Sequence, residues 1–151
     1  MSSDAKIKPP LLALLVCERA LVDEDKIVSL IRIVDTFNFI IEPESLAQQK
    51  LEEMNILIQC TVFTRWGPGR GEFTAELRIA APNGVESPQV GQLKFQLPGG
   101  FHFQQIRHNV NFVTKQSGIY VFRIYLDNEL TGEYPFRVNI EQKPPSEHSK
   151  Q

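Results

Sequence analysis

The feature that most constrains this chain is an alternation of apolar and polar side chains with a period of two residues. It is cleanest in residues 72–79, where the apolar positions are Phe73, Ala75, Leu77 and Ile79 and polar side chains stand between them. A period of two places the apolar residues on one face of a β-strand. Strands of this kind pair as antiparallel sheets that have one wet face and one face against a core.

The same alternation predicts strands over most of the chain, at residues 11–22, 27–41, 54–66, 72–79, 93–97, 105–112, 120–127 and 134–141. Proline and glycine separate them at the spacing that is typical of a sandwich. We therefore predict an all-β fold, an antiparallel two-sheet sandwich of about eight strands, with a barrel as the alternative. Residues 43–53 are rich in Gln and Glu, and we expect one short helix there.

The last two predicted strands repeat this alternation. Their apolar sets include Phe122 and Ile124 in the first strand and Phe136 and Val138 in the second. Asp127 and Asn128 lie between the strands and tolerate the positive φ angles of a tight turn. We expect these four apolar side chains to meet in one core.

Length and composition favour one ordinary globular domain. Residues 1–10 and 142–151 lack an apolar period, which predicts flexible tails on either side of a domain at 11–141. The net charge is −2, and no block of like charges supplies the basic stripe that nucleic acid requires. The longest apolar run, Leu11 to Cys17, is too short to span a bilayer as a helix.

Two cysteines, Cys17 and Cys60, are too few for a disulfide framework, and we expect free buried thiols in a reducing cytoplasm. Leu14 to Cys17 faintly matches a lipoprotein cleavage site, but Val16 is not the small residue that such sites need. A cytoplasmic location is the stronger expectation.

The spacing of the histidines does not predict a metal site. His102 and His108 lie six residues apart on one predicted strand, and about 20 Å of strand separates such positions. His108 shares the apolar face of Ile106 and Val110, which favours a hydrogen-bonded histidine at the edge of the core. We assign no catalytic residue, cofactor or metal, and we expect a protein that is not an enzyme.

Residues 65–71 form the most distinctive local segment, because three glycines and a proline interrupt the alternation. Arg65, Trp66 and Arg70 are the best candidates for binding, since Trp and Arg are enriched at interaction hot spots. Trp66 is also in phase with Ile58 and Val62, which favours the alternative that it closes the end of the core. Both arginines are expected to be exposed, because the loop leaves the sheet.

Residues 117–122, Ser-Gly-Ile-Tyr-Val-Phe, resemble the stretch of immunoglobulin-like sandwiches that leads into the corner tyrosine, here Tyr120. Phe122 stands where antibody domains carry a cysteine, so the resemblance implies the sandwich alone. The chain also resembles small bacterial proteins that are grouped as a domain of unknown function. Its apolar opening, the strand from Ile27 and the closing residues 118–138 carry that resemblance.

These observations favour a non-catalytic module that interacts with another protein. Two alternatives belong to other classes. One is a sandwich that binds carbohydrate or a small ligand through Trp66, and the other is a small enzyme without a recognisable motif.

Overall fold

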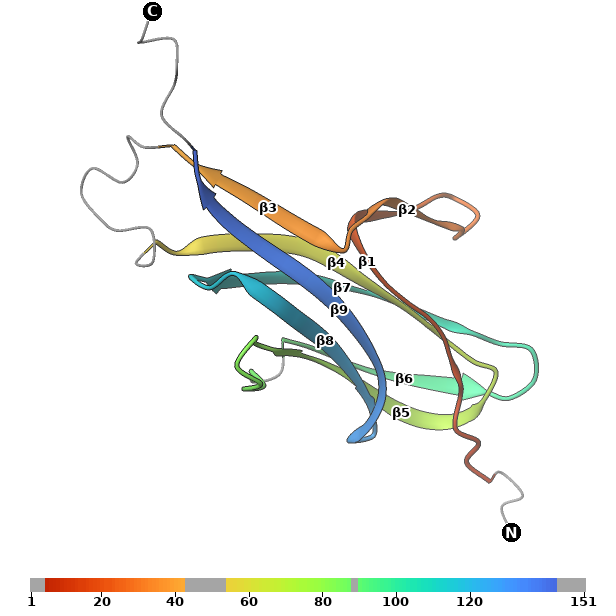
Figure 1. The fold of residues 1–151 in the computed structure, drawn as a ribbon. Helices are drawn as coiled ribbons and strands as arrows, with labels where there is room; N and C mark the ends of the chain where they lie inside the picture. Colours follow the sequence, from red (N-terminus) through yellow and green to blue (C-terminus); the bar gives the residue numbers. More distant parts are fainter. Residues whose placement is uncertain (1–4, 43–53, 88–89, 144–151) are drawn as a thin grey trace, which may run out of the picture.

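The protein is a two-layer β-sandwich, seen in a computed structural model that describes residues 5–42, 54–87 and 90–143 (Figure 1). These residues form nine strands, listed in chain order: β1 (Leu11–Val22), β2 (Val28–Ile33), β3 (Thr36–Ile41), β4 (Ile56–Trp66), β5 (Arg70–Ala80), β6 (Gly91–Pro98), β7 (Gln104–Thr114), β8 (Gly118–Leu126) and β9 (Glu129–Gln142). One sheet has the order β2-β1-β4-β7, and the other has the order β3-β9-β8-β5-β6. The predicted all-β sandwich is confirmed, and the barrel alternative is wrong because the strands form two separate sheets.

The prediction of a single strand over residues 27–41 is wrong. The chain crosses between the sheets at Val34 and Asp35: the Val34 amide donates to Val16 of β1, and the Asp35 carbonyl accepts from Arg137 of β9. β3 then runs parallel to β9, so the sandwich is not entirely antiparallel. Alternation continues through the crossing, which is why the pattern could not reveal it. The helix predicted for residues 43–53 lies outside the described residues.

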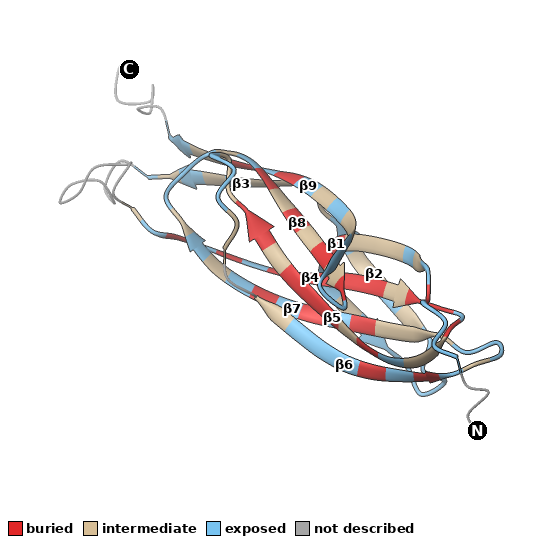
Figure 2. Ribbon diagram, turned by 90° about the horizontal axis from the view of Figure 1, so that it is seen from below, coloured by how far each residue is buried: buried red, intermediate tan, exposed pale blue. Residues whose placement is uncertain are grey.

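The core lies between the two sheets, where the inward side chains of β4, β5, β7, β8 and β9 meet. Figure 2 shows the buried residues of these strands in red. Phe122, Ile124, Phe136 and Val138 are all buried there, which confirms the predicted hairpin. The Phe122 and Phe136 rings stack with their centroids 4.6 Å apart. Apolar burial of this kind contributes most of the favourable free energy of folding.

The connections identify the sandwich as immunoglobulin-like. The strands β1, β4 and β7 stand in the places of strands A, B and E, and β5, β6, β8 and β9 in those of C, C′, F and G. Tyr120, at the start of β8, donates its hydroxyl to the Gln116 carbonyl at 2.7 Å and also bonds to Thr114. This bond back to the preceding turn is the tyrosine corner of such folds.

Cys17 and Cys60 are free and buried, as predicted. Burial raises the pKa of the Cys60 thiol to about 12, so the thiol stays protonated. The described residues include no helix that could cross a membrane.

Candidate functional site

Trp66 belongs to the core and not to a binding surface. It ends β4 fully buried, its indole nitrogen donates to the Thr64 hydroxyl at 3.0 Å, and its ring lies 6.3 Å from that of Phe95. The alternative that Trp66 closes the core is confirmed, since it continues the inward phase of Ile58 and Val62. A ligand-binding sandwich that depends on this ring therefore loses its central residue.

The turn after Trp66 does not protrude, although its glycines and proline predicted that it would. Gly67 and Gly69 are buried because two other segments cover them. Gly67 has φ +130°, and a Cβ atom there would lie 2.6 Å from the His102 carbonyl oxygen. On the other side Ile7 exchanges two backbone hydrogen bonds with Arg70, of 2.8 and 2.9 Å. Only glycine allows the chain segments to approach this closely.

Arg65 and Arg70 are half-buried, so the expectation that both are freely exposed is wrong. The Arg65 guanidinium lies over the Phe103 ring, 4.5 Å from its centroid. The Arg70 side chain packs along Gly99, where a Cβ atom would lie 2.9 Å from Arg70 Nε. Both contacts come from the loop between β6 and β7, which covers the turn.

That loop presents an aromatic side chain which the sequence analysis missed. Phe101 is 85% exposed, the highest value among the exposed large apolar residues. Its ring meets Phe103 edge to face, with centroids 4.7 Å apart. Arg65, Phe103 and Phe101 therefore form one continuous stack at this end of the sandwich. The available signal was a pair of phenylalanines, one directly after Gly99 and Gly100 and the other two residues later, because the glycines end the regular strand before them.

Residues 6–10, assigned from sequence to a flexible tail, make defined contacts at the same end. Lys6 pairs with Asp127 and Lys8 with Glu129, each at 2.8 Å. Asp127 also accepts a hydrogen bond from the Thr74 amide, at 2.8 Å. We call the turn 67–69, the loop 99–103 and the segment 5–10 together the loop end.

His108 is buried beside a hollow of about 460 Å³ between β6 and β7. Desolvation lowers the pKa of its imidazole to about 4, so the ring is neutral near pH 7. Its Nε2 atom has no hydrogen-bond partner among the described residues, although the sequence favoured a hydrogen-bonded histidine. The lining residues include no carboxylate that could pair with the imidazole; they are Gly91, Gln92, Leu93, Gln105, Ile106, Arg107, His108 and Asn109.

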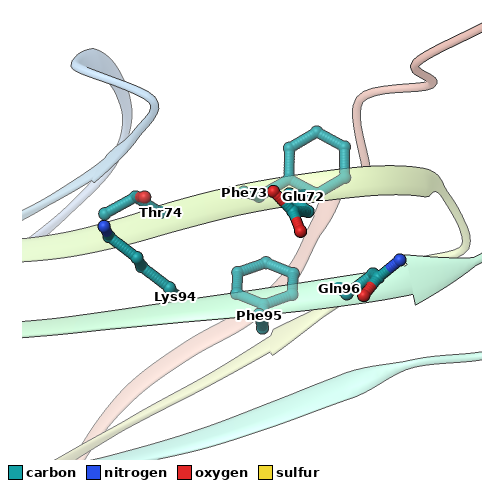
Figure 3. A pocket seen from close by; sticks show the side chains of 6 residues that line it. All are labelled: Glu72, Phe73, Thr74, Lys94, Phe95 and Gln96. Atoms are coloured by element: carbon teal, nitrogen blue, oxygen red, sulfur yellow. The ribbon is translucent and has the colours of Figure 1, made fainter.

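A second hollow, also of about 460 Å³, lies over β5 and β6 (Figure 3). It is lined by Glu72, Phe73, Thr74, Lys94, Phe95 and Gln96. Glu72 faces Gln96 across the strands, and Thr74 faces Lys94. One carboxylate and one ammonium group, without a histidine, do not form a nucleophile and base pair. Among the described residues no three His, Cys, Asp or Glu side chains group as metal ligands.

Comparison with known proteins gives structural likenesses and one family. An alkylpurine DNA glycosylase from Pseudomonas fluorescens, bound to DNA containing an abasic site analogue, has 11% identity and a TM-score of 0.49. The match covers 89% of this chain but only 31% of that enzyme. An immunoglobulin-like protein from Pseudomonas aeruginosa has 10% identity and a TM-score of 0.38, with 91% of this chain and 100% of that chain covered. No curated protein matches.

The model of a family of unknown function, DUF6941, matches residues 12–139, which include every strand of both sheets at least in part. The chain belongs to this family of unknown function, DUF6941.

Proposed function

We propose that this protein is a non-catalytic protein-interaction module that contacts its partner through Phe101 at the loop end. The observation that carries the proposal is the 85% exposure of that ring. Burying a side chain of this size contributes a favourable free energy of about 1.5 to 3 kcal/mol, and the exposed ring does not contribute it in the isolated chain. A complex in which a partner covers Phe101 would be stabilised by that burial.

The stack beneath Phe101 holds the ring in place before a partner arrives. Phe103 supports it at 4.7 Å, and Arg65 in turn covers Phe103 at 4.5 Å. A side chain that is already ordered loses less conformational entropy on binding. Aromatic side chains and arginine are also enriched at the centres of protein interfaces.

The arginines at this end are available to carboxylates of a partner. Neither Arg65 nor Arg70 forms an ion pair with a described residue. A guanidinium group can donate two parallel hydrogen bonds to one carboxylate. Arg65 and Arg70 therefore keep the binding role proposed for them, whereas Trp66 contributes only as support in the core.

The test is affinity capture from the native cell extract with the wild-type chain, Phe101→Ser, and Arg65→Ala combined with Arg70→Ala. Val85→Ser is the matched control, because Val85 is also exposed and lies in the loop after β5, at the opposite end of that strand. Phe101→Ser should change the free energy of unfolding by less than about 0.5 kcal/mol. We expect it to release a partner that the control retains. Retention of every captured protein by folded Phe101→Ser would refute the proposal.

A further inference from the structure

The hollow beside His108 opens along one side of the sandwich, between the two sheets. β6 is the outer strand of one sheet and β7 is the outer strand of the other, and neither has a further neighbour among the described residues. The hollow between them has a volume of about 460 Å³. Sites for small molecules usually have volumes of about 300 to 1,000 Å³. The hollow is therefore large enough for a compound of one ring.

Gly91 of β6 leaves space at the floor of this hollow. It lies opposite Leu77 of β5 and shares the inward phase of Leu93 and Phe95. A Cβ atom at Gly91 would lie 3.0 Å from His108 Nδ1. The imidazole therefore reaches across from β7 to β6. Leu93 is 39% exposed although it points inward, because the hollow opens beside it.

His108 brings one polar group to a floor that is otherwise apolar. It shares the inward phase of Ile106 and Val110 in β7, and only 7% of its surface is exposed. Its Nε2 atom has no hydrogen-bond partner among the described residues. A buried polar atom without a partner lowers the stability of the fold, and an apolar side chain at this position would avoid that loss. A hydrogen bond from Nε2 to a ligand would explain why an imidazole stands here.

The opening of the hollow is polar and contains no acidic group. The residues that alternate with the floor border it; they are Gln92, Gln105, Arg107 and Asn109. β7 is the last strand of its sheet, so backbone groups along its outer edge are also open to hydrogen bonds. This opening suits hydroxyl groups and disfavours a cation, since Arg107 carries a positive charge and no carboxylate lines the hollow.

We propose that this hollow binds a small neutral ring compound that carries hydroxyl groups, such as a sugar, through a hydrogen bond to His108 Nε2. A hydroxyl group can donate or accept, so it would satisfy Nε2 in either tautomer of the imidazole. The apolar carbon face of such a ring packs against Leu93 and Ile106. Its remaining hydroxyl groups face the polar opening.

Binding of glucose and of myo-inositol to the full chain tests the proposal. A two-bond proton–nitrogen NMR spectrum follows the resonance of His108 Nε2 directly. We expect both compounds to shift this resonance in a saturable way, with dissociation constants below about 10 mM. Glucosamine has the same ring and a positive charge. It should bind at least about threefold more weakly than glucose, because the hollow offers that charge no carboxylate.

Two variants change the floor of the hollow in different ways. His108→Leu removes the hydrogen bond and should weaken binding by about tenfold, measured on the backbone amide resonances of β7. It should unfold at a denaturant concentration no lower than the wild type, since it removes an unpartnered polar atom. Gly91→Ala keeps the imidazole but crowds it, and should also weaken binding. His102→Leu is the matched control, because His102 is exposed and does not line the hollow.

Two results would overturn the proposal. One is the absence of a saturable shift at His108 with either compound up to about 100 mM, which would mean that water alone occupies the hollow. The other is binding that both His108→Leu and Gly91→Ala leave unchanged. Phe101→Ser should bind glucose as the wild type does, so this inference and the proposed function can fail independently.

Discussion

The β8–β9 hairpin and the β1–β2 hairpin of residues 18–33, which we call the wing, are both antiparallel hairpins rich in apolar residues, yet they differ in burial. β8 buries Tyr120, Phe122, Ile124 and Leu126, because the four-stranded sheet lies opposite. The wing buries no residue, because it extends beyond the opposite sheet. An apolar pattern therefore states which residues can be buried, and the position of the element in the fold decides whether they are.

The largest effect should come from the covered hairpin. Phe122→Ala removes a fully buried ring that stacks on Phe136, and the cavity adds to the lost transfer free energy. We expect the free energy of unfolding to fall by roughly 3 to 5 kcal/mol. Chemical denaturation measures it. An unchanged transition midpoint would contradict the burial on which the comparison depends.

The next effect concerns a histidine that the sandwich encloses. The pKa of His108 is lowered from 6.5 to about 4, so the unfolded chain binds a proton more readily than the folded chain. The free energy of unfolding therefore keeps its full value above about pH 6.5. It declines by roughly 3 kcal/mol as the pH falls from 6.5 toward 4. Denaturation across this range measures the decline.

The matched variant is His108→Gln, which cannot titrate. It should flatten the dependence between pH 6.5 and 4. An equally steep decline in this variant would place its origin elsewhere in the molecule.

A smaller effect should come from the ion-pair network on the outer face of the five-stranded sheet. Glu86 accepts hydrogen bonds from Tyr125 at 2.6 Å, Arg78 at 2.9 Å and Arg123 at 3.1 Å. The hydrogen bond from Tyr125, followed by those from the arginines, lowers the pKa of Glu86 to about 2. Its contribution is present above its ordinary pKa and is lost as the pH falls from about 4.5 toward 2.

Glu86→Gln should lower the free energy of unfolding by about 1 to 2 kcal/mol near pH 7. Glu18→Gln is the counterpart in the wing, where the exposed pair with Arg32 should contribute less than about 0.5 kcal/mol. Equal losses in the two variants would mean that the network is no stronger than one surface pair.

The smallest effect should come from an apolar residue of the wing. Leu21→Ala removes a side chain that is about half exposed, and we expect the free energy of unfolding to change by no more than about 0.5 kcal/mol. Thermal unfolding measured beside Phe122→Ala compares the two hairpins directly. A loss above about 1 kcal/mol would contradict the exposed position of the wing.

Much of the fold could be predicted from local pattern. Alternation located the strands, Tyr120 indicated the corner of an immunoglobulin-like sandwich, and the phase of Trp66 with Ile58 favoured its burial. The loop end was harder. Arg65 and Arg70 were selected, but the aromatic stack on Phe103 and Phe101 joins residues far apart in sequence, which no local pattern relates.

The sequence by itself determined which residues alternate and therefore which segments form strands, because the two faces of a strand are set by neighbouring residues. Only the tertiary structure decided that residues 27–41 divide between two sheets, that β3 runs parallel to β9, and that the wing is left uncovered. Those outcomes depend on which strands lie opposite or beside each segment. Contacts between distant parts of the chain make that choice, and a period of two residues carries no information about them.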